Sequence, residues 1–460
     1  MTHALRLLPV PLLVFVLAGP ILGTGTMRPW SALALAGWLI AVLPLTRPTE
    51  RAFLAAAALS AGVVALTLPG AGATLALALD RALVFVAIMH ALGLLRDAAR
   101  TSRAVRDCGA WLIAQAPAWR FVAIAGGGHA FGIALNMGAV TLLGTLVNRA
   151  NTLDAAGGDP RVVAIRRERM NVALLQGFFA MLVWSPMAIS IAFTLAMIPS
   201  LTWFDIAPPA LGFTAVFLAL AWAMDRLKWP PNRRLSPAIA RPAPPVRRAL
   251  PMAGLILALV ALTLGLKAAF RYPMLEAIAT VAFAFALPWL YLQYRARTVH
   301  AGAATLRRLR AHLRRRMPEA RPEAIVLAAA SFLGVTLGAL ARQAGLSDLL
   351  DALAPPAWVL ALGIAAFVIG GSQLGIVALV TSGIAGGAVL GMTNSPLAPL
   401  ALALSLQIGW ALSSVLSAYS GGTMLLSRIA GASPAEFRRW NLPWAATCFA
   451  LFGIAAYVFF

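Results

Sequence analysis

The segment Trp119–Val147 reads WRFVAIAGGGHAFGIALNMGAVTLLGTLV, and its flanks constrain how the whole chain can cross a membrane. A single helix through this segment would place the flanking stretches 96–120 and 149–169 on opposite faces. Both stretches are rich in arginine, and arginine-rich loops concentrate on the cytoplasmic face of membrane proteins. A re-entrant hairpin that enters and leaves on the cytoplasmic face, with its turn near Gly126–Gly128, removes the conflict.

The composition supports a membrane location for most of the chain. Of the 460 residues, 61% are hydrophobic and only 11% are charged, whereas soluble domains carry about 25% charged residues. Apolar runs of about 20 residues recur along the chain, and each could cross a hydrocarbon core of about 30 Å. Backbone groups at that depth must be satisfied within the segment, so the runs must be helices. The sequence therefore predicts an all-α polytopic membrane protein.

The formal net charge of +22 could suggest a nucleic-acid-binding protein. We exclude that class, because the basic residues lie in short loops between apolar runs, as the positive-inside rule describes. Cys108 and Cys448 are the only cysteines, and their positions indicate neither a disulfide framework nor a metal site.

Simple membrane-spanning helices are expected wherever an apolar run is not interrupted. They fall at about 7–23, 29–46, 52–68, 74–95, 207–225, 250–269, 272–293, 324–341 and 441–459. The first run could instead be a cleaved signal sequence, although the further spans favour a membrane helix. The charge distribution places the N-terminus in the cytoplasm, the C-terminus outside, and the protein in a bacterial-type cytoplasmic (inner) membrane.

A second interrupted region resembles the first. Segment 357–391 is expected to form a hairpin that enters from outside and turns at Gly370–Gly371. With this threading, most of the 37 lysine and arginine residues lie on the cytoplasmic face. The Pro- and Arg-rich stretches 226–250 and 294–322 are expected to be solvated loops.

Each hairpin is followed by a long apolar helix with a polar interruption. The first interruption is Trp184-Ser185-Pro186-Met187, and the second lies between Ser413 and Thr423. Inverted repeats with re-entrant hairpins and discontinuous transmembrane helices are typical of secondary transporters. The predicted regions are 1–95 (scaffold helices), 96–206 (transport region), 207–356 (scaffold helices with basic loops), 357–440 (transport region) and 441–460 (C-terminal helix).

The arrangement resembles the ion transporter superfamily, which includes the divalent anion/sodium symporters. Phe131–Gly144 resembles the first hairpin tip of that family and the helix that leaves it, with Asn136 at the position of the tip asparagine. Leu175–Met187 resembles the first broken helix, Gly371–Gly375 the second tip, and Leu412–Thr423 the second broken helix. The resemblance implies a scaffold and a transport region in each half, and transport of a small solute.

Half-helix N-termini suit an anion, and unwound carbonyl and hydroxyl groups suit Na⁺ or a proton-linked site. The residues that could bind substrate or ion are Asn136, Ser185, Ser372, Gln373, Ser417, Ser420 and Thr423. The alternative for the serines is that small residues allow close helix packing. Asn136 and Gln373 favour a binding role, because a large amide at a turn inside the membrane needs partners.

Three ionisable residues within the apolar segments also need an explanation. His129, beside the glycines, could bind substrate or carry a proton, or could be a hydrogen-bonded core histidine. Asp80 and Arg81 lie inside one span, where ionisable residues are functional candidates. Because neighbours on a helix point apart, we interpret this pair as structural.

The leading functional hypothesis is a secondary active transporter for a small, anionic solute, coupled to Na⁺ or H⁺ and using no cofactor. A cation/proton antiporter is the alternative, although only Asp80 offers a suitable carboxylate. A membrane-embedded enzyme is disfavoured, because no nucleophile–base pair or acidic cluster appears. The expected partners are the solute and the lipid bilayer, with a homodimer left open.

Overall fold

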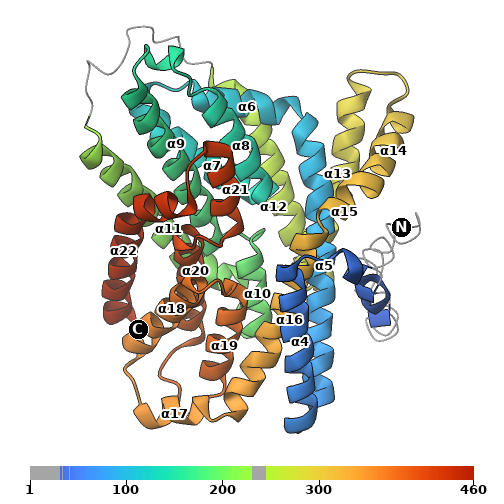
Figure 1. Ribbon diagram of the computed structural model, residues 1–460, viewed down its shortest axis with the longest axis vertical. Helices are drawn as coiled ribbons and strands as arrows, with labels where there is room; N and C mark the ends of the chain where they lie inside the picture. The colour runs from blue at the N-terminus through green and yellow to red at the C-terminus, as the bar shows by residue number, and fades with distance from the viewer. Residues whose placement is uncertain (1–31, 34, 41, 231–244) are drawn as a thin grey trace. The chain divides into compact units, whose positions relative to one another are not determined.

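A computed structural model describes residues 32–460 apart from 34, 41 and 231–244 (Figure 1). Every regular element among these residues is a helix, and eight helices are long and apolar enough to cross a membrane. The protein is therefore an all-α polytopic membrane protein. The predicted span 7–23 lies outside the described residues, and 29–46 is described only in part.

The chain divides into two compact units. Unit 1 contains the residues up to Thr101, Ala261–Ala354 and Leu379–Ser395. Unit 2 contains Ser102–Val260, Pro355–Ala378 and Pro396–Phe460.

Unit 1 is built around the long helix α5, which packs against α13 and α16, while α4 packs against both α16 and α5. Its elements are η1 (Leu43–Leu45), α4 (Pro48–Thr67), α5 (Ala71–Thr101), α13 (Met274–Arg295), α14 (Ala301–Ala311), η6 (His312–Arg316), α15 (Met317–Glu319), α16 (Arg321–Gln343), α17 (Leu346–Leu353) and α19 (Ala378–Leu390). The predicted spans 52–68, 74–95, 272–293 and 324–341 correspond to α4, α5, α13 and α16.

Unit 2 contains the first hairpin and both broken helices. Its elements are α6 (Arg103–Ile113), α7 (Pro117–Leu135), α8 (Met137–Arg149), η2 (Asp154–Ala156), α9 (Pro160–Ala180), η3 (Met181–Val183), α10 (Ile189–Met197), α11 (Trp203–Lys228), η5 (Val246–Arg248), α18 (Ala357–Gln373), α20 (Pro399–Leu416), α21 (Gly421–Ala430) and α22 (Pro434–Phe459). Helix α12 (Leu250–Phe270) begins in unit 2 and ends in unit 1. The predicted spans 207–225, 250–269 and 441–459 correspond to α11, α12 and α22.

Within unit 1, the helix ends that the charge pattern assigns to one face lie together. Contacts at this end join Arg96 to Glu323, Arg321 to Glu50, and Thr101 to Gln293. At the opposite end, the Gln343 amide donates to the Thr67 carbonyl at 2.6 Å. The alternating directions of α4, α5, α13 and α16 therefore agree with the predicted threading.

The helix directions in unit 2 also agree with the predicted threading, and this unit contains the predicted inner hairpin. The open ends of α7 and α8 both lie beside the basic first half of α9, where Arg120 of α7 is close to Arg166 and Arg169. Contacts at this end join Asn148 to Asn171, Arg169 to Asp225, and Arg167 to the Gly431 carbonyl. Segment Pro117–Arg149 therefore turns back on itself.

Both turns lie beyond the glycines where the charge pattern predicted them, so those two positions are wrong, whereas the tips expected from the resemblance, Asn136 and Gly371–Gly375, contain the turns. Gly126–Gly128 lie inside α7, and the chain reverses at Asn136 instead. Gly370 and Gly371 lie inside α18, which ends at Gln373, and the turn glycine there is Gly375 with φ +83°. The two legs α18 and α19 belong to different units.

The stretch 294–322 is largely exposed, as predicted, but it is helical and not a loop. It contains α14, the π-helical turn η6 and α15, which follow one another from Ala301 to Glu319. Asp97 of α5 is buried against this stretch and binds Arg308. This ion pair, with its carboxylate buried, holds the basic segment against α5.

The topology can be tested with cysteine labelling in intact cells. Ala110 and Ala155 are exposed at the end that we predict to be cytoplasmic, whereas Asn394 is exposed in the connector that we predict to be outside. Cysteines at 110 and 155 should resist a membrane-impermeant thiol reagent, and a cysteine at 394 should react. Labelling at 110 or 155 would contradict the inner-hairpin assignment.

The native cysteines should contribute little background to that experiment. Cys108 and Cys448 are both buried. Burial also raises the pKa of the Cys108 thiol to about 11, so the reactive thiolate is scarce at neutral pH and appears only as the pH rises toward that value.

Candidate functional site

The first hairpin reverses at Asn136, in a backbone conformation that few residues adopt. Asn136 has φ +49° and ψ −133°, and its Oδ1 accepts a 2.7 Å hydrogen bond from the Met137 amide. The side chain is half-buried. Asparagine tolerates positive φ better than most residues, because its short polar side chain can bond to nearby backbone. The tip asparagine expected from the sequence is therefore the turn residue.

Gly128 of α7 and Gly177 of α9 allow these two helices to pack closely. A Cβ on Gly177 of α9 would lie 1.9 Å from the Ala125 carbonyl oxygen of α7. A Cβ on Gly128 of α7 would lie 2.6 Å from the Leu174 carbonyl oxygen of α9. The two backbones touch at these positions, as small residues permit in membrane helices.

The first helix break lies between η3 and α10, at the predicted Trp-Ser-Pro-Met sequence. Ser185 is fully buried there, and its Oγ accepts from the Met187 amide at 3.2 Å. The Ser190 hydroxyl donates to the Leu182 carbonyl at 2.8 Å. These bonds satisfy backbone groups that the break releases from helical pairing. Ser185 is thus placed at the break as expected, with its hydroxyl directed to the backbone.

His129 joins α7 to this first break. Trp184 Nε1 donates to His129 Nε2 at 3.0 Å, and His129 Nδ1 lies 3.2 Å from the Gly177 carbonyl oxygen. Because an indole N–H only donates, Nε2 must be the unprotonated nitrogen, and Nδ1 carries the proton that the carbonyl accepts. Both ring nitrogens are therefore occupied within the protein, as in a hydrogen-bonded core histidine.

The second helix break separates α20 from α21 and contains Ser417 and Ser420. The Ser420 Oγ caps α21 by accepting from the Thr423 amide at 3.2 Å. The Thr423 hydroxyl lies 2.9 Å from Ser420 Oγ and 3.3 Å from the Ser414 carbonyl oxygen. Thr423 is fully buried, so this pair bridges the two half-helices across the break.

The second predicted tip lies against this same break. The Ser417 hydroxyl donates to the Ser372 carbonyl at 2.7 Å, and the Ser372 hydroxyl donates to the Ile369 carbonyl at 2.7 Å. The Gln373 Nε2 donates to Ser372 Oγ at 3.1 Å. The carbonyl ends of α18 and α20 therefore meet, with the half-buried Gln373 beside them.

Two half-helices also begin side by side in unit 2. A Cβ on Gly421, the first residue of α21, would lie 3.5 Å from the Met137 methyl group at the start of α8. Farther along, a Cβ on Gly144 of α8 would lie 2.6 Å from Leu426 Cδ1 of α21. The helices α8 and α21 therefore run parallel from adjacent N-termini.

The end of the first long helix also lies near this point. A Cβ on Gly422 would lie 2.7 Å from the ring of Phe179, in the last turn of α9. Both hairpin-type tips and the second break thus lie in one region of unit 2, which we call the convergence site. It is defined by Asn136, Ser372–Gln373 and Ser417–Thr423. Ser185 lies at the first break, whose η3 packs against α20.

Sequence reasoning missed two residues near the breaks. Tyr419 lies inside the second break and is 64% exposed, and a Cβ on Gly375 would lie 3.7 Å from its ring. Gln407 of α20 is fully buried, and its Nε2 donates to Thr194 Oγ1 at 2.6 Å and to the Ser190 carbonyl at 3.0 Å. A large amide within an apolar run was the available signal for Gln407.

Among the described residues, no group of three or more His, Cys, Asp or Glu side chains could hold a metal ion. The polar atoms of the convergence site are hydroxyls, amides and backbone groups. Such a site can bind and orient a solute, and it offers no nucleophile–base pair.

Asp80 and Arg81 lie in α5 of unit 1, whereas all seven predicted binding residues lie in unit 2. We therefore expect Asp80→Asn and Arg81→Gln to retain solute uptake once a solute is known. Uptake by each variant is compared with wild type at equal membrane expression. Loss of uptake in Asp80→Asn, with normal membrane insertion, would favour the antiporter interpretation instead.

Comparisons with solved structures find chains of similar fold. No family model matches the chain, and no curated protein matches it. The YdaH transporter of Alcanivorax borkumensis is 15% identical, and the match covers 89% of this chain and 97% of that one, with a TM-score of 0.53. MtrF of Neisseria gonorrhoeae, described among antimetabolite efflux pumps, is 16% identical over 80% and 79%, with a TM-score of 0.41. The chain is therefore similar in fold to the YdaH transporter.

Proposed function

We propose that this protein is a secondary active transporter that moves a small anionic solute across a bacterial-type cytoplasmic membrane, coupled to Na⁺ or H⁺. The observation that carries the proposal is the convergence site. The N-termini of α8 and α21 begin side by side there, and the carbonyl ends of α18 and α20 meet beside the same helix break. A transporter-like fold supports the same conclusion.

The paired N-termini favour an anionic solute. The first turn of a helix has unpaired N–H groups and the positive end of the helix dipole. One such end stabilises an anion by about 0.3–1 kcal/mol when exposed, and by up to about 2 kcal/mol when partly buried. Asn136 stands between α7 and α8 and adds an amide donor, because its Oδ1 is the atom that bonds to Met137.

The paired C-termini favour a coupling cation. Helix C-termini and unwound carbonyl groups are the groups that coordinate Na⁺ or a proton-linked site in broken-helix transporters. Here the oxygens of Ser372, Gln373 and Ser417 lie at the meeting point of α18 and α20. A cation there would lie near an anion at α8 and α21, so the two would stabilise each other.

The finer assignment follows the resemblance noted from the sequence. We place the protein with symporters of the ion transporter superfamily, with the two interrupted regions as inverted repeats. Transport would then proceed by alternating access, as the regions carrying the breaks move against the scaffold helices.

A ligand-dependent melting screen of the purified protein tests the proposal. Carboxylates, sulfur oxyanions and amino acids are each tested with and without Na⁺, and at two pH values. A solute at 100 times its Kd should stabilise the fold by about 2.7 kcal/mol. We expect stabilisation by a small anion that increases when Na⁺ is added or the pH is lowered. Stabilisation only by cations would support an antiporter and overturn the anion assignment.

A further inference from the structure

The basic stretch between α13 and α16 forms an ordered helical arm. This basic arm consists of α14, η6 and α15, from Ala301 to Glu319. Its middle turn, His312–Arg316, is π-helical. Such turns are rare and occur frequently at functional sites. The proposed transport site in unit 2 does not include the arm, which belongs to unit 1.

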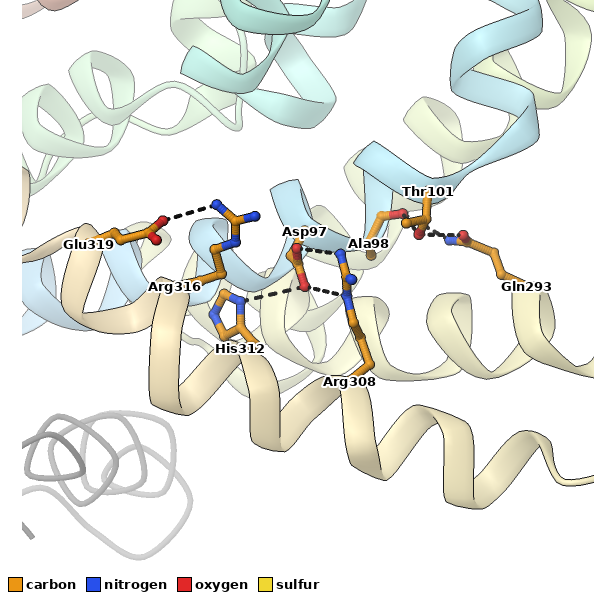
Figure 2. A network of polar contacts seen from close by, with 8 residues as sticks. All are labelled: Asp97, Ala98, Thr101, Gln293, Arg308, His312, Arg316 and Glu319. Carbon is orange, nitrogen blue, oxygen red and sulfur yellow. Dashed lines mark hydrogen bonds and ion pairs between the residues drawn. The ribbon is translucent and has the colours of Figure 1, made fainter. Parts of the chain in front are cut away.

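One face of the basic arm is fixed to α5 by a buried carboxylate. Arg308 donates to both oxygens of Asp97, at 2.8 and 2.7 Å, and His312 Nδ1 lies 3.8 Å from the same carboxylate (Figure 2). The Asp97 and His312 side chains are each 5% exposed. Bidentate arginine–carboxylate pairs fix geometry as well as contributing energy.

A second set of contacts holds the helix on which the arm packs. Gln293 of α13 donates to the Ala98 carbonyl at 3.0 Å, and the Thr101 hydroxyl donates to Gln293 at 2.9 Å (Figure 2). Helix α14 packs along α13. Contacts with α5 and with α13 therefore fix the orientation of the arm. They also determine which of its residues face outward.

That outward face has a dense, uncompensated positive charge. Arg307, Arg310, Arg314 and Arg315 are all exposed, and none forms an ion pair or side-chain hydrogen bond with a described residue. Arg316 differs, because it pairs with Glu319 at 3.0 Å. An anionic partner would neutralise this positive charge.

Apolar and aromatic residues place this face at a membrane surface. Leu306 is 46% exposed and shares the arm with the partly exposed Leu309 and Leu313. The last turns of α13 contain Tyr291, which is 43% exposed, and the partly exposed Tyr294. Tyrosines gather at the headgroup level of membrane proteins, and basic helices with an apolar face lie in that layer.

We infer that the basic arm binds the phosphate-bearing headgroups of anionic phospholipids. Arg307, Arg310, Arg314 and Arg315 contact the headgroups, while the leucines enter the boundary between headgroups and acyl chains. Asp97 is the positioning residue that holds the arm in this orientation. Each arginine near an anionic membrane surface contributes about fivefold in affinity.

The test uses full-length protein in a neutral detergent, titrated with phosphatidylglycerol or with phosphatidylcholine of the same acyl chains. The melting temperature is recorded at each lipid concentration. Phosphatidylglycerol should stabilise the wild type more than phosphatidylcholine, and about 1 M NaCl, where the Debye length is about 3 Å, should weaken the difference. In the variant R307Q/R310Q/R314Q/R315Q, the half-maximal phosphatidylglycerol concentration should rise by more than about tenfold.

The matched control removes the same charge elsewhere. Arg103, Arg106, Arg149 and Arg161 are also exposed, and R103Q/R106Q/R149Q/R161Q should keep the phosphatidylglycerol response. If the quadruple arm variant does not fold, R315Q should weaken the response more than R316Q, whose arginine is already paired. Equal losses in arm and control variants, equal stabilisation by phosphatidylcholine, or the same stabilisation by inorganic phosphate would each overturn the proposal.

Discussion

Gly177→Ala should destabilise the protein by about 3 kcal/mol or more, the upper end of the range for overpacked cores. The added methyl would lie 1.9 Å from the Ala125 carbonyl oxygen and 2.6 Å from the Ala125 carbonyl carbon. These are backbone atoms, so no side chain can rotate to make room, and α7 must move away from α9. The measurement is the melting temperature of the purified variant, together with its yield in the membrane.

Gly126→Ala is the matched control for this substitution. It adds the same methyl to α7, within one helical turn of the contact, and nothing lies within 4 Å of the new atom. Alanine is favoured over glycine in helices by about 1 kcal/mol, so the control should be neutral or slightly stabilised. Equal melting temperatures for the two variants would show that α7 and α9 are not packed as described.

Substitutions at Asn136 and Gln373 should each weaken solute binding about fivefold to more than a hundredfold. Loss of a buried hydrogen-bond partner costs about 1–3 kcal/mol. The structure places Asn136 at the start of α8 and Gln373 at the end of α18, on either side of the second helix break. If both contact one solute, the double variant should depart from additivity.

The choice of substitution at Asn136 follows from its backbone. A residue with φ +49° and ψ −133° is strained unless it is glycine, and the cost is about 1–3 kcal/mol. Asn136→Gly removes the amide and keeps the turn, whereas Asn136→Ala should also lower the melting temperature. The affinity of Asn136→Gly, Gln373→Ala and their combination is measured for a solute found in the screen. Unchanged affinity in both folded single variants would remove these residues from the site.

The fold was largely predictable because membrane helices follow simple rules. Apolar runs of sufficient length marked α4, α5, α11, α12, α13, α16 and α22. The positive-inside rule then predicted that 119–147 turns back on itself. The position of the turn was not predictable in the same way. A glycine run indicates either a turn or a close helix contact, and only the tertiary partner α9 distinguishes them.

In the basic stretch 294–322, the sequence indicated a loop where the structure has helices. Its Pro- and Arg-rich composition indicated a solvated loop. The residue that orders it, Asp97, is 211 residues from Arg308 in the sequence, so no local pattern could reveal the pairing. The leucines at 306, 309 and 313 follow helical spacing and were the available local signal.

For the candidate site, the sequence predicted where the polar residues lie better than which groups they bind. Ser185, Ser417, Ser420 and Thr423 do lie at the two helix breaks, because small hydroxyl residues compete for released backbone groups. Their bonds to backbone and to one another occupy those hydroxyls in the structure. Asn136 and Gln373 remain the candidates with the most free hydrogen-bonding capacity.

The most direct test of the proposed function is solute accumulation in proteoliposomes. The protein is reconstituted, and uptake of a radiolabelled anionic solute from the screen is followed with an imposed Na⁺ or H⁺ gradient. The proposal predicts accumulation above the external concentration, which disappears when an ionophore collapses the coupling gradient and is strongly reduced in Asn136→Gly. Uptake that only equilibrates the solute, with the same rate with or without either gradient, would contradict a secondary active transporter.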